Sequence, residues 1–463
     1  MHPDSNRATL ARELAQRIAS TTARDLTEKA VHYAKIGLLD TLGVAIAGAR
    51  EEATVIARRV AAAEPGPSLL FGTAQRVSPL AAAFVNGIAA NVLDFDDCSD
   101  PLGGHPSAPV LPALIALAES VQASGTDVLL AYVTGFETET QIARGVNFHH
   151  YEKGWHATAT LGVFGAAAAC SRLLNLPVAQ AVTALSLAAS FSSGIKANLG
   201  SMAKPLHVGH CARNGLLAAL LAREGFSAND DALEGHQGYL ELFNGPGRYD
   251  IGRILQKWGK PFDIEMPGIA IKQHPCCLSV QSAVDAMLAL AREEDIEPDA
   301  VARIESKTYP RRLEHTDRPA PRSALEAKLS IQYCLARALA DRKVTLEHFT
   351  ETRYRDPRVA RLMTLVHAGT FEHAPPADND DFGAEVRVTT KSGRVHTRTL
   401  NRPIGHDPGV PLAVELLEAK FHQCADAVLG AERAARVCDK VFGLENLATV
   451  GALTSALSPE ASY

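Results

Sequence analysis

The chain has 463 residues, enough for two or three core-forming units at the usual domain size of ~100–200 residues. Its apolar fraction of 46 % and charged fraction of 21 % are ordinary for a globular protein. A formal net charge of −6 gives no global electrostatic reason to bind nucleic acid or a membrane surface. The eight cysteines form no CxxC pair and are too sparse for a disulfide scaffold, so reduced thiols are expected. Since no signal peptide or run of ~20 apolar residues is evident, we expect a cytoplasmic protein without a membrane span.

The first half of the sequence predicts a series of helices. Two helical patterns fill residues 8–50, and Ser78-Pro79 is typical of an N-cap followed by proline in the first turn. The helix that follows would end in the acidic, turn-rich segment DFDDCSDPLGGHPS, after which Ser107 could cap another helix. Further helices are expected over about 126–144, 157–174, 178–193 and 206–224. They are rich in Ala and Gly, which favours close helix packing in a compact bundle.

The pattern changes near residue 262. Residues 301–309 alternate like a strand, a helix is expected over about 324–341, and two more strands over 384–390 and 394–400 are separated by the hairpin signal Ser392-Gly393. Helix returns from about residue 410. We therefore expect an all-helical domain from residues 1–264 and 404–463, and a smaller α+β domain over 265–403.

Several polar side chains stand at unusual places for a helical bundle. Three carboxylates, at Asp94, Asp96 and Asp97, follow a predicted helix end, where the helix dipole disfavours negative charge. A solvated acidic loop explains them equally simply. His105 lies between two glycines and a proline, where an imidazole could act as a general acid or base, or could tie down the loop.

Three further segments carry candidate binding residues. His156 stands at the start of an Ala-rich helix, Lys204 precedes a largely apolar helix, and Lys272 follows an apolar stretch at the predicted domain boundary. A helix start favours anions, and a cation beside apolar surface needs a partner such as a substrate carboxylate. Each lysine alone is more simply a surface charge. The adjacent Cys276 and Cys277 lack further ligands at metal spacing and are interpreted as helix-start residues.

Taken together, six strings along the chain resemble the MmgE/PrpD family, and they occur in the family's order. They are LLDTLGVAIAGA (38–49), AAFVNGIAANVLDFDD (82–97) with GHPS (104–107), GWHATATLGVFGAAAA (154–169), KPLHVGHCARNG (204–215), AIKQHPC (270–276) and EAKLSIQY (326–333). The family includes 2-methylcitrate dehydratase, cis-aconitate decarboxylase and iminodisuccinate epimerase. The resemblance implies a mainly α fold with a smaller α+β lid domain, a homodimer, and no metal or organic cofactor.

The resemblance also implies roles for particular residues. Catalytic and substrate-binding positions of the family match Asp94, His105, His156, Lys204 and Lys272. The implied chemistry is proton transfer next to a carboxylate of a small anionic di- or tricarboxylate, without nucleic acid or membrane partners. In this view His105 moves the proton, the lysines and His156 bind carboxylates, and Asp94 orients a neighbouring histidine or lysine.

Two features leave the reaction type open. Cys98 stands where the decarboxylase branch has threonine, and the loop between Asp94 and His105 is one residue longer than in that branch. The loop length, the GWHATATLGVFG string and Tyr151, a possible second acid or base, look more like the epimerase branch. Cys98 and Tyr151 would line the substrate pocket. The sequence therefore predicts a lyase of the dehydratase or decarboxylase type, with an epimerase of an imino- or amino-dicarboxylate as the alternative and a non-catalytic helical binding protein as a third reading.

Overall fold

The computed structural model describes residues 9–61, 64–375, 381–406 and 412–459. Contacts divide the chain into two compact units, each of which combines separate stretches of sequence. Unit 1 comprises Met1–Val92, Asp96–Ile269 and Ala413–Tyr463, and unit 2 comprises Leu93–Phe95 and Ala270–Leu412. The sequence placed these boundaries at 264/265 and 403/404.

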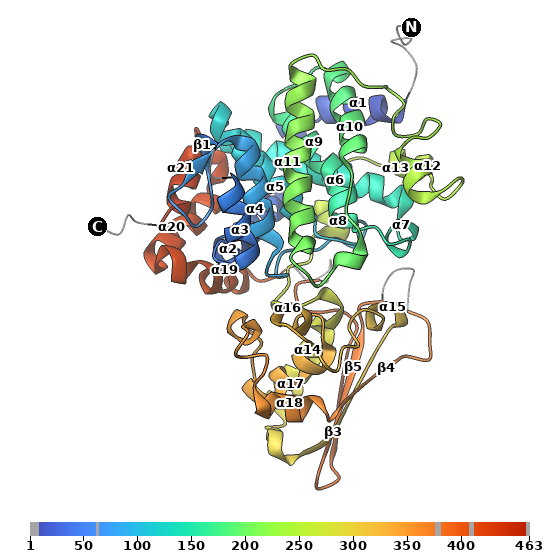
Figure 1. Cartoon of the computed structure of the whole chain (residues 1–463), viewed down its shortest axis with the longest axis vertical. Helices are drawn as coiled ribbons and strands as arrows, with labels where there is room; N and C mark the ends of the chain where they lie inside the picture. The colour runs from blue at the N-terminus through green and yellow to red at the C-terminus, as the bar shows by residue number, and fades with distance from the viewer. Residues whose placement is uncertain (1–8, 62–63, 376–380, 407–411, 460–463) are drawn as a thin grey trace. The chain divides into compact units, whose positions relative to one another are not determined.

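Unit 1 is built mainly of helices (Figure 1). A short two-stranded ribbon, β1 (Pro65–Leu69) with β2 (Arg76–Val77), was not predicted, since its five and two residues are too few for a strand period. The longer helices of this unit are α1 (Leu10–Ser20), α2 (Glu28–Gly48), α3 (Glu52–Ala61), α4 (Pro79–Asn91), α5 (Ser107–Val121), α6 (Gly125–Val146), α9 (Gly162–Leu173), α10 (Val178–Phe191), α11 (Ala203–Arg223), α19 (Val414–Leu429) and α20 (Ala431–Phe442).

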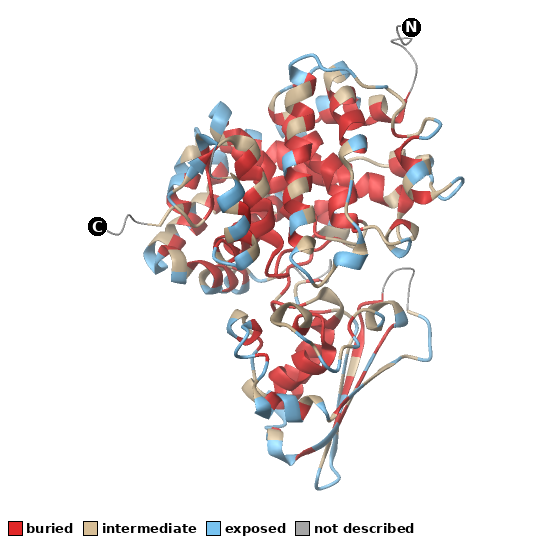
Figure 2. Cartoon of the chain, viewed as in Figure 1, coloured by how far each residue is buried: buried red, intermediate tan, exposed pale blue. Residues whose placement is uncertain are grey.

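Small residues bring these helices together, as the composition predicted. At the crossing of α4 and α11, a Cβ on Gly87 would lie 2.8 Å from the Cα of Gly209, so neither position has room for a side chain. The central helices of the unit, α4, α5, α6, α9 and α11, pack closely against one another. Buried residues are concentrated in these helices (Figure 2). At the crossing of α4 and α11 the two helices therefore approach more closely than any larger residue would allow.

Helix α2 also sits in this core. By length and composition alone it could cross a bilayer, but 83 % of its apolar window is buried inside the protein, which makes it weak evidence for a membrane span. The C-terminal helix α19 packs on α2, where Gly43 lies against the ring of Phe421. Beside this contact Lys420 forms a buried ion pair with Asp40 at 2.5 Å.

The helix starts bear out one capping prediction and correct another. Ser78 caps α4 by accepting a hydrogen bond from the amide of Ala81, with Pro79 in the first turn. Ser107, in contrast, is the first residue of α5 rather than its cap, because its hydroxyl hydrogen-bonds Asp97 and Tyr132. The helix predicted over 157–174 is divided at Leu161 into α8 (Ala157–Thr160) and α9.

Unit 2 contains a four-stranded mixed sheet in the order β4-β3-β5-β6. The strands are β3 (Val301–Thr308), β4 (Val366–Thr370), β5 (Ala384–Thr390) and β6 (Val395–Leu400). β3 pairs with β4 in parallel and with β5 antiparallel, so that Ile304 lies opposite both Val366 and Val388. The predicted turn joins β5 to β6, and Gly393 takes the left-handed conformation there with φ +86°.

Helices α14 (Leu278–Glu293) and α17 (Ile331–Asp341) pack against this sheet and against each other (Figure 1). The helix predicted over 324–341 is divided into α16 (Ala324–Ala327) and α17, because Ser330 caps α17 through the amide of Tyr333. Strand β4 was not predicted, since five residues with a glycine give a weak strand signal. A helical unit and a smaller α+β unit confirm the predicted fold class.

Candidate active site

His105 lies at the end of the acidic loop that follows α4, immediately before α5. Its Nδ1 is 2.9 Å from the backbone carbonyl oxygen of Asp97 and 3.1 Å from a carboxylate oxygen of Asp96. A carbonyl oxygen only accepts hydrogen bonds, so Nδ1 carries the proton in the neutral ring. This tautomer assigns the lone pair, and hence proton uptake, to Nε2.

Asp96 is the carboxylate behind this imidazole. It is fully buried and also accepts a hydrogen bond from the side-chain amide of Asn91 at the end of α4. A carboxylate paired with the far nitrogen of a histidine fixes the ring orientation and raises its basicity. The sequence noted Asp96 only as one of three loop carboxylates, because spacing does not show which of them faces the imidazole.

Asp97 holds the same loop in place through hydrogen bonds with Ser107. Its carboxylate accepts from both the amide and the hydroxyl of Ser107, and the Ser107 hydroxyl also contacts the Tyr132 hydroxyl. Burial, together with the nearby charge of Asp40, raises the pKa of Asp97 to about 7, although the Ser107 hydrogen bond opposes the shift. Hydrogen bonds of the His105 ring, the Ser107 backbone amide and the Asp97 carboxylate therefore hold this loop in place.

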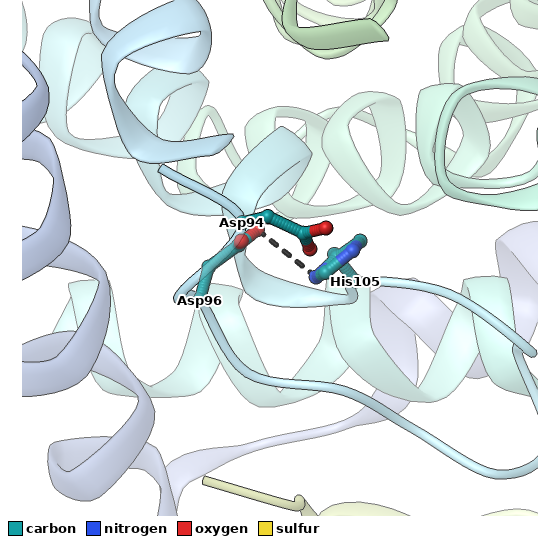
Figure 3. A group of neighbouring side chains, drawn as sticks. All are labelled: Asp94, Asp96 and His105. Atoms are coloured by element: carbon teal, nitrogen blue, oxygen red, sulfur yellow. Dashed lines mark ion pairs between the residues drawn. The ribbon is translucent and has the colours of Figure 1, made fainter. Parts of the chain in front are cut away.

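Figure 3 shows Asp94, Asp96 and His105 on this loop, with the ion pair between Asp96 and His105 dashed. One ligand atom of each lies within 4.8 Å of the others, an arrangement of two carboxylates and one imidazole that could bind a divalent ion. Asp96 is already paired with His105, and Asp94 with Lys272. The expectation that the protein works without metal stays a prediction, and this cluster is the place to test it.

Lys272 is a buried cation in unit 2. Its side chain is 1 % exposed, and Nζ lies 2.6 Å from a carboxylate oxygen of Asp94 and 3.0 Å from the Asp94 carbonyl oxygen. Asp94 itself has a left-handed backbone with φ +52°, which aspartate tolerates better than most residues. Asp94, the partner of Lys272, lies two residues before Asp96, the partner of His105, so the two ion pairs are adjacent in the sequence.

His156, the N-cap residue of α8, makes a contact that the sequence did not predict. Its Nδ1 lies 3.2 Å from Nδ1 of His207, so one of the two nitrogens donates to the other. His207 is on α11, one turn after Lys204, and burial lowers its pKa. The spacing Lys204-x-x-His207 places both side chains on one face of α11, which was a signal in the sequence. Because α8 has four residues, a helix-dipole role for His156 is not supported.

The His105 loop and the His156 segment meet within unit 1. The amide of His105 donates to the Thr158 hydroxyl at 3.1 Å, and a Cβ on Gly104 would clash with the same residue. Gly103 adopts φ +62°, which the sequence anticipated from the paired glycines. This contact links the His105 loop to the segment that carries His156.

Cys98 and Tyr151 differ in their surroundings. The Cys98 thiol is buried, 3.8 Å from Nδ1 of His105. Tyr151, on the short helix α7 (His149–Glu152), is partly exposed, and Lys196 Nζ lies 3.7 Å from its ring centroid. Of the predicted residues, the structure therefore joins Cys98 to His105 and Asp94 to Lys272. A pocket of about 550 Å³ in unit 1, beside His32 and Lys35, has none of the predicted residues in its lining.

These arrangements coincide with the segments that carry the family motifs. The MmgE/PrpD N-terminal domain matches residues 12–251, and the MmgE/PrpD C-terminal domain matches residues 274–444. The chain belongs to the MmgE/PrpD family. Its relatives include human cis-aconitate decarboxylase, 31 % identical over 448 residues that cover 93 % of this chain and 91 % of that protein.

Other decarboxylases in this family are similarly related. The mouse cis-aconitate decarboxylase is 30 % identical, with 93 % of this chain and 90 % of that protein covered. A cis-aconitate decarboxylase of Aspergillus terreus is 26 % identical, with coverage of 98 % and 97 %. The chain is an MmgE/PrpD-type enzyme, a lyase or an isomerase.

Proposed function

We propose that this chain is a cofactor-independent lyase that transfers a proton at the carbon next to a carboxylate of a small di- or tricarboxylate. The observation that carries the proposal is the His105 arrangement, in which Nδ1 is held by Asp96 and by a backbone carbonyl. A histidine fixed in this way presents Nε2 as the acid or base. Because several relatives are cis-aconitate decarboxylases, decarboxylation is the first reaction to test.

In this mechanism the cations of the site bind the substrate carboxylates. In unit 1, Lys204 supplies positive charge and the His156–His207 pair supplies a hydrogen-bond donor. Lys272 of unit 2, paired with Asp94, is by itself a candidate for binding a carboxylate. Loss of carbon dioxide leaves negative charge on the α-carbon and its remaining carboxylate, which these cations stabilise. For this step the His105 ring must first take up a proton at Nε2 from water, and it then delivers that proton to the carbon while Nδ1 keeps its own. In a dehydration, the same nitrogen would remove the α-proton while a second acid protonates the leaving hydroxyl.

An epimerase of an imino- or amino-dicarboxylate is the second candidate. It is favoured by the length of the loop between Asp94 and His105 and by Tyr151. Cys98, whose thiol lies 3.8 Å from Nδ1 of His105, departs from the threonine of the decarboxylase branch. An epimerase needs proton access to both faces of the carbon, and Tyr151, with Lys196 over its ring, would be the second acid or base.

One experiment separates these reactions. The enzyme is incubated in deuterated water with cis-aconitate, 2-methylcitrate and iminodisuccinate, and products are followed by NMR. A decarboxylase releases carbon dioxide and incorporates one deuterium, a dehydratase eliminates water, and an epimerase exchanges the α-hydrogen without net loss of atoms. His236→Gln, at an 85 % exposed side chain, serves as control for the His105 variant described below. If none of the three polycarboxylates exchanges or reacts, the proposal is wrong.

Three further properties belong to this proposal. Dialysis against a strong chelator should leave activity unchanged, and loss of activity that zinc or iron restores would assign a metal to the Asp94, Asp96 and His105 cluster.

We propose a homodimer, so sedimentation equilibrium should give a mass near twice 49.3 kDa. A cytoplasmic location is supported by the eight cysteines, all of which are free thiols.

A further inference from the structure

Cys277 differs from the other seven cysteines. It is the one that is not buried, and all eight lie in the part of the chain that the structure describes. It is the N-cap residue of α14, a helix of 16 residues. Its sulfur lies 3.6 Å from Nε2 of His315, and the same nitrogen is 3.1 Å from the hydroxyl of Ser279. Cys277 and His315 therefore form a thiol–imidazole pair at a helix start.

The electrostatics of this pair favour the thiolate. Burial by itself would raise the pKa of the Cys277 thiol, but the hydrogen bond and charge of His315 lower it to about 6. Lys272 adds to the lowering, and Asp94 opposes it. The start of a helix also favours an anion through the helix dipole, and Cys277 is the N-cap residue of α14.

The neighbouring Cys276 shows the opposite environment. It is fully buried, and burial raises its pKa well above the ordinary value for a thiol. The Gln281 amide donates a hydrogen bond to its sulfur at 3.3 Å. Two adjacent cysteines thus form a matched pair, in which one residue is partly exposed and has an imidazole beside its sulfur, while the other is enclosed in the core.

We propose that Cys277, with its thiol beside the His315 imidazole, is a nucleophile and a covalent modification site for soft carbon electrophiles. The step balances without another reactant. The thiolate sulfur attacks the electrophilic carbon, an S–C bond forms, and the leaving group departs with its electron pair. The thiol proton passes to Nε2 of His315, which lies 3.6 Å from the sulfur. The inference is independent of the proposed lyase reaction, since it concerns a residue that the mechanism does not use.

The test is the pH dependence of alkylation by iodoacetamide in the intact, full-length protein. The variant Cys276→Ala leaves Cys277 as the single cysteine of residues 273–292, which trypsin releases as one peptide, and short labelling pulses from pH 5 to 9 are read by the mass of that peptide. We expect half-maximal rate near pH 6. At pH 6.5 labelling should be about fivefold faster than for N-acetylcysteine, because a larger thiolate fraction outweighs the lower nucleophilicity of a low-pKa thiolate.

Two variants serve as comparisons. His315→Gln removes the positive charge, so the midpoint should move up toward the ordinary thiol value of about 8.5. His367→Gln, at an exposed histidine of the same unit, should leave it unchanged. In the converse variant Cys277→Ala, Cys276 should remain unlabelled.

A midpoint near pH 8.5 in the Cys276→Ala protein would overturn the proposal, as would the absence of labelling in the folded protein. An unchanged midpoint in a folded His315→Gln protein would also overturn it. If His315→Gln does not fold, the profile measured with His315 present decides alone. Because the readout is a peptide mass and needs no substrate, its outcome is separate from that of the polycarboxylate assay.

Discussion

Asp97 of unit 1 and Lys272 of unit 2 are both ionisable side chains buried beside a predicted functional residue, and they are stabilised in different ways. Asp97 has Ser107 as hydrogen-bond donor but lies near the acids Asp40 and Asp96, and its pKa is raised to about 7. Lys272 is in contact with Asp94, which neutralises its charge. A bound proton removes the negative charge of Asp97, whereas the carboxylate of Asp94 compensates the positive charge of Lys272.

This difference indicates which substitutions should lower the free energy of unfolding most. A group that a proton can neutralise tolerates a neutral replacement, whereas removal of one member of a buried ion pair leaves the other charge without compensation. The residues that move protons should follow a third rule, since their replacement affects rate rather than stability.

The largest effect is expected for His105→Gln. Glutamine can keep the hydrogen bond to the Asp97 carbonyl through its amide, but it cannot transfer a proton. We expect kcat to fall by ~10²–10⁴ with little change in melting temperature. Steady-state kinetics and thermal unfolding measure the two quantities. If the variant keeps more than about a tenth of the original kcat, proton transfer belongs to another residue, with Tyr151, His156 or Lys204 as the next candidates.

Lys272→Met should reduce both stability and activity. The substitution leaves the Asp94 carboxylate buried without its cation, which costs about 3–5 kcal/mol in the free energy of unfolding. We expect kcat/KM to fall at least ~10-fold as well. The double variant Asp94→Asn/Lys272→Met should recover a large part of the stability but not the activity. Equal denaturant midpoints for the single and double variants would contradict the compensated ion pair.

Lys204→Ala should reduce activity while the fold is retained. Lys204 is partly exposed in the first turn of α11, where a shorter side chain is compatible with the helix. Loss of a charge-assisted hydrogen bond to a substrate carboxylate costs about 1.5–3 kcal/mol, which predicts a fall in kcat/KM of at least ~10-fold. Lys391→Ala, at an exposed lysine, is the control. Normal turnover in the Lys204 variant would remove this lysine from the binding site.

The smallest effect concerns Asp97→Asn and the pH dependence of stability. Because the folded-state pKa is about 7 and the ordinary value is 3.8, the folded protein holds a proton that the unfolded chain releases between about pH 4 and 7. Stability from this group is therefore present at low pH and lost as the pH rises through about 7. Each pKa unit corresponds to about 1.4 kcal/mol, so the contribution is on the order of 1–4 kcal/mol.

Asparagine is neutral at every pH, so the melting temperature of Asp97→Asn should decline less between pH 5 and 8 than that of the unsubstituted protein. Some decline should remain, because burial and the charge of Asp263 also raise the pKa of Glu137 to about 7. Asp299→Asn, at an 85 % exposed side chain, should leave the profile unchanged. Parallel profiles for Asp97→Asn and the unsubstituted protein would contradict the raised pKa.

Much of the helical framework could be predicted from the sequence. Ser78-Pro79 predicted the start of α4 because capping is a local hydrogen bond, and Ser392-Gly393 predicted the turn between β5 and β6 because a left-handed residue is a local requirement. The abundance of Ala and Gly predicted the close crossing of helices, although not the pairing of Gly87 with Gly209. The ordered motifs predicted the family.

The tertiary structure decided the partners of the polar residues. Ser107 was predicted as a helix cap, yet it bonds Asp97 and Tyr132. Cys277 was interpreted as a helix-start residue, and its contact with His315, 38 residues away, gives it a second chemical character. Caps, turns and helix periods depend on neighbours within a few residues, whereas the pKa of a buried group depends on charges and burial that distant segments supply. The sequence by itself therefore determined which residues were candidates for proton transfer and charge binding, and only the tertiary structure decided which of them share a proton, an ion pair or a hydrogen bond.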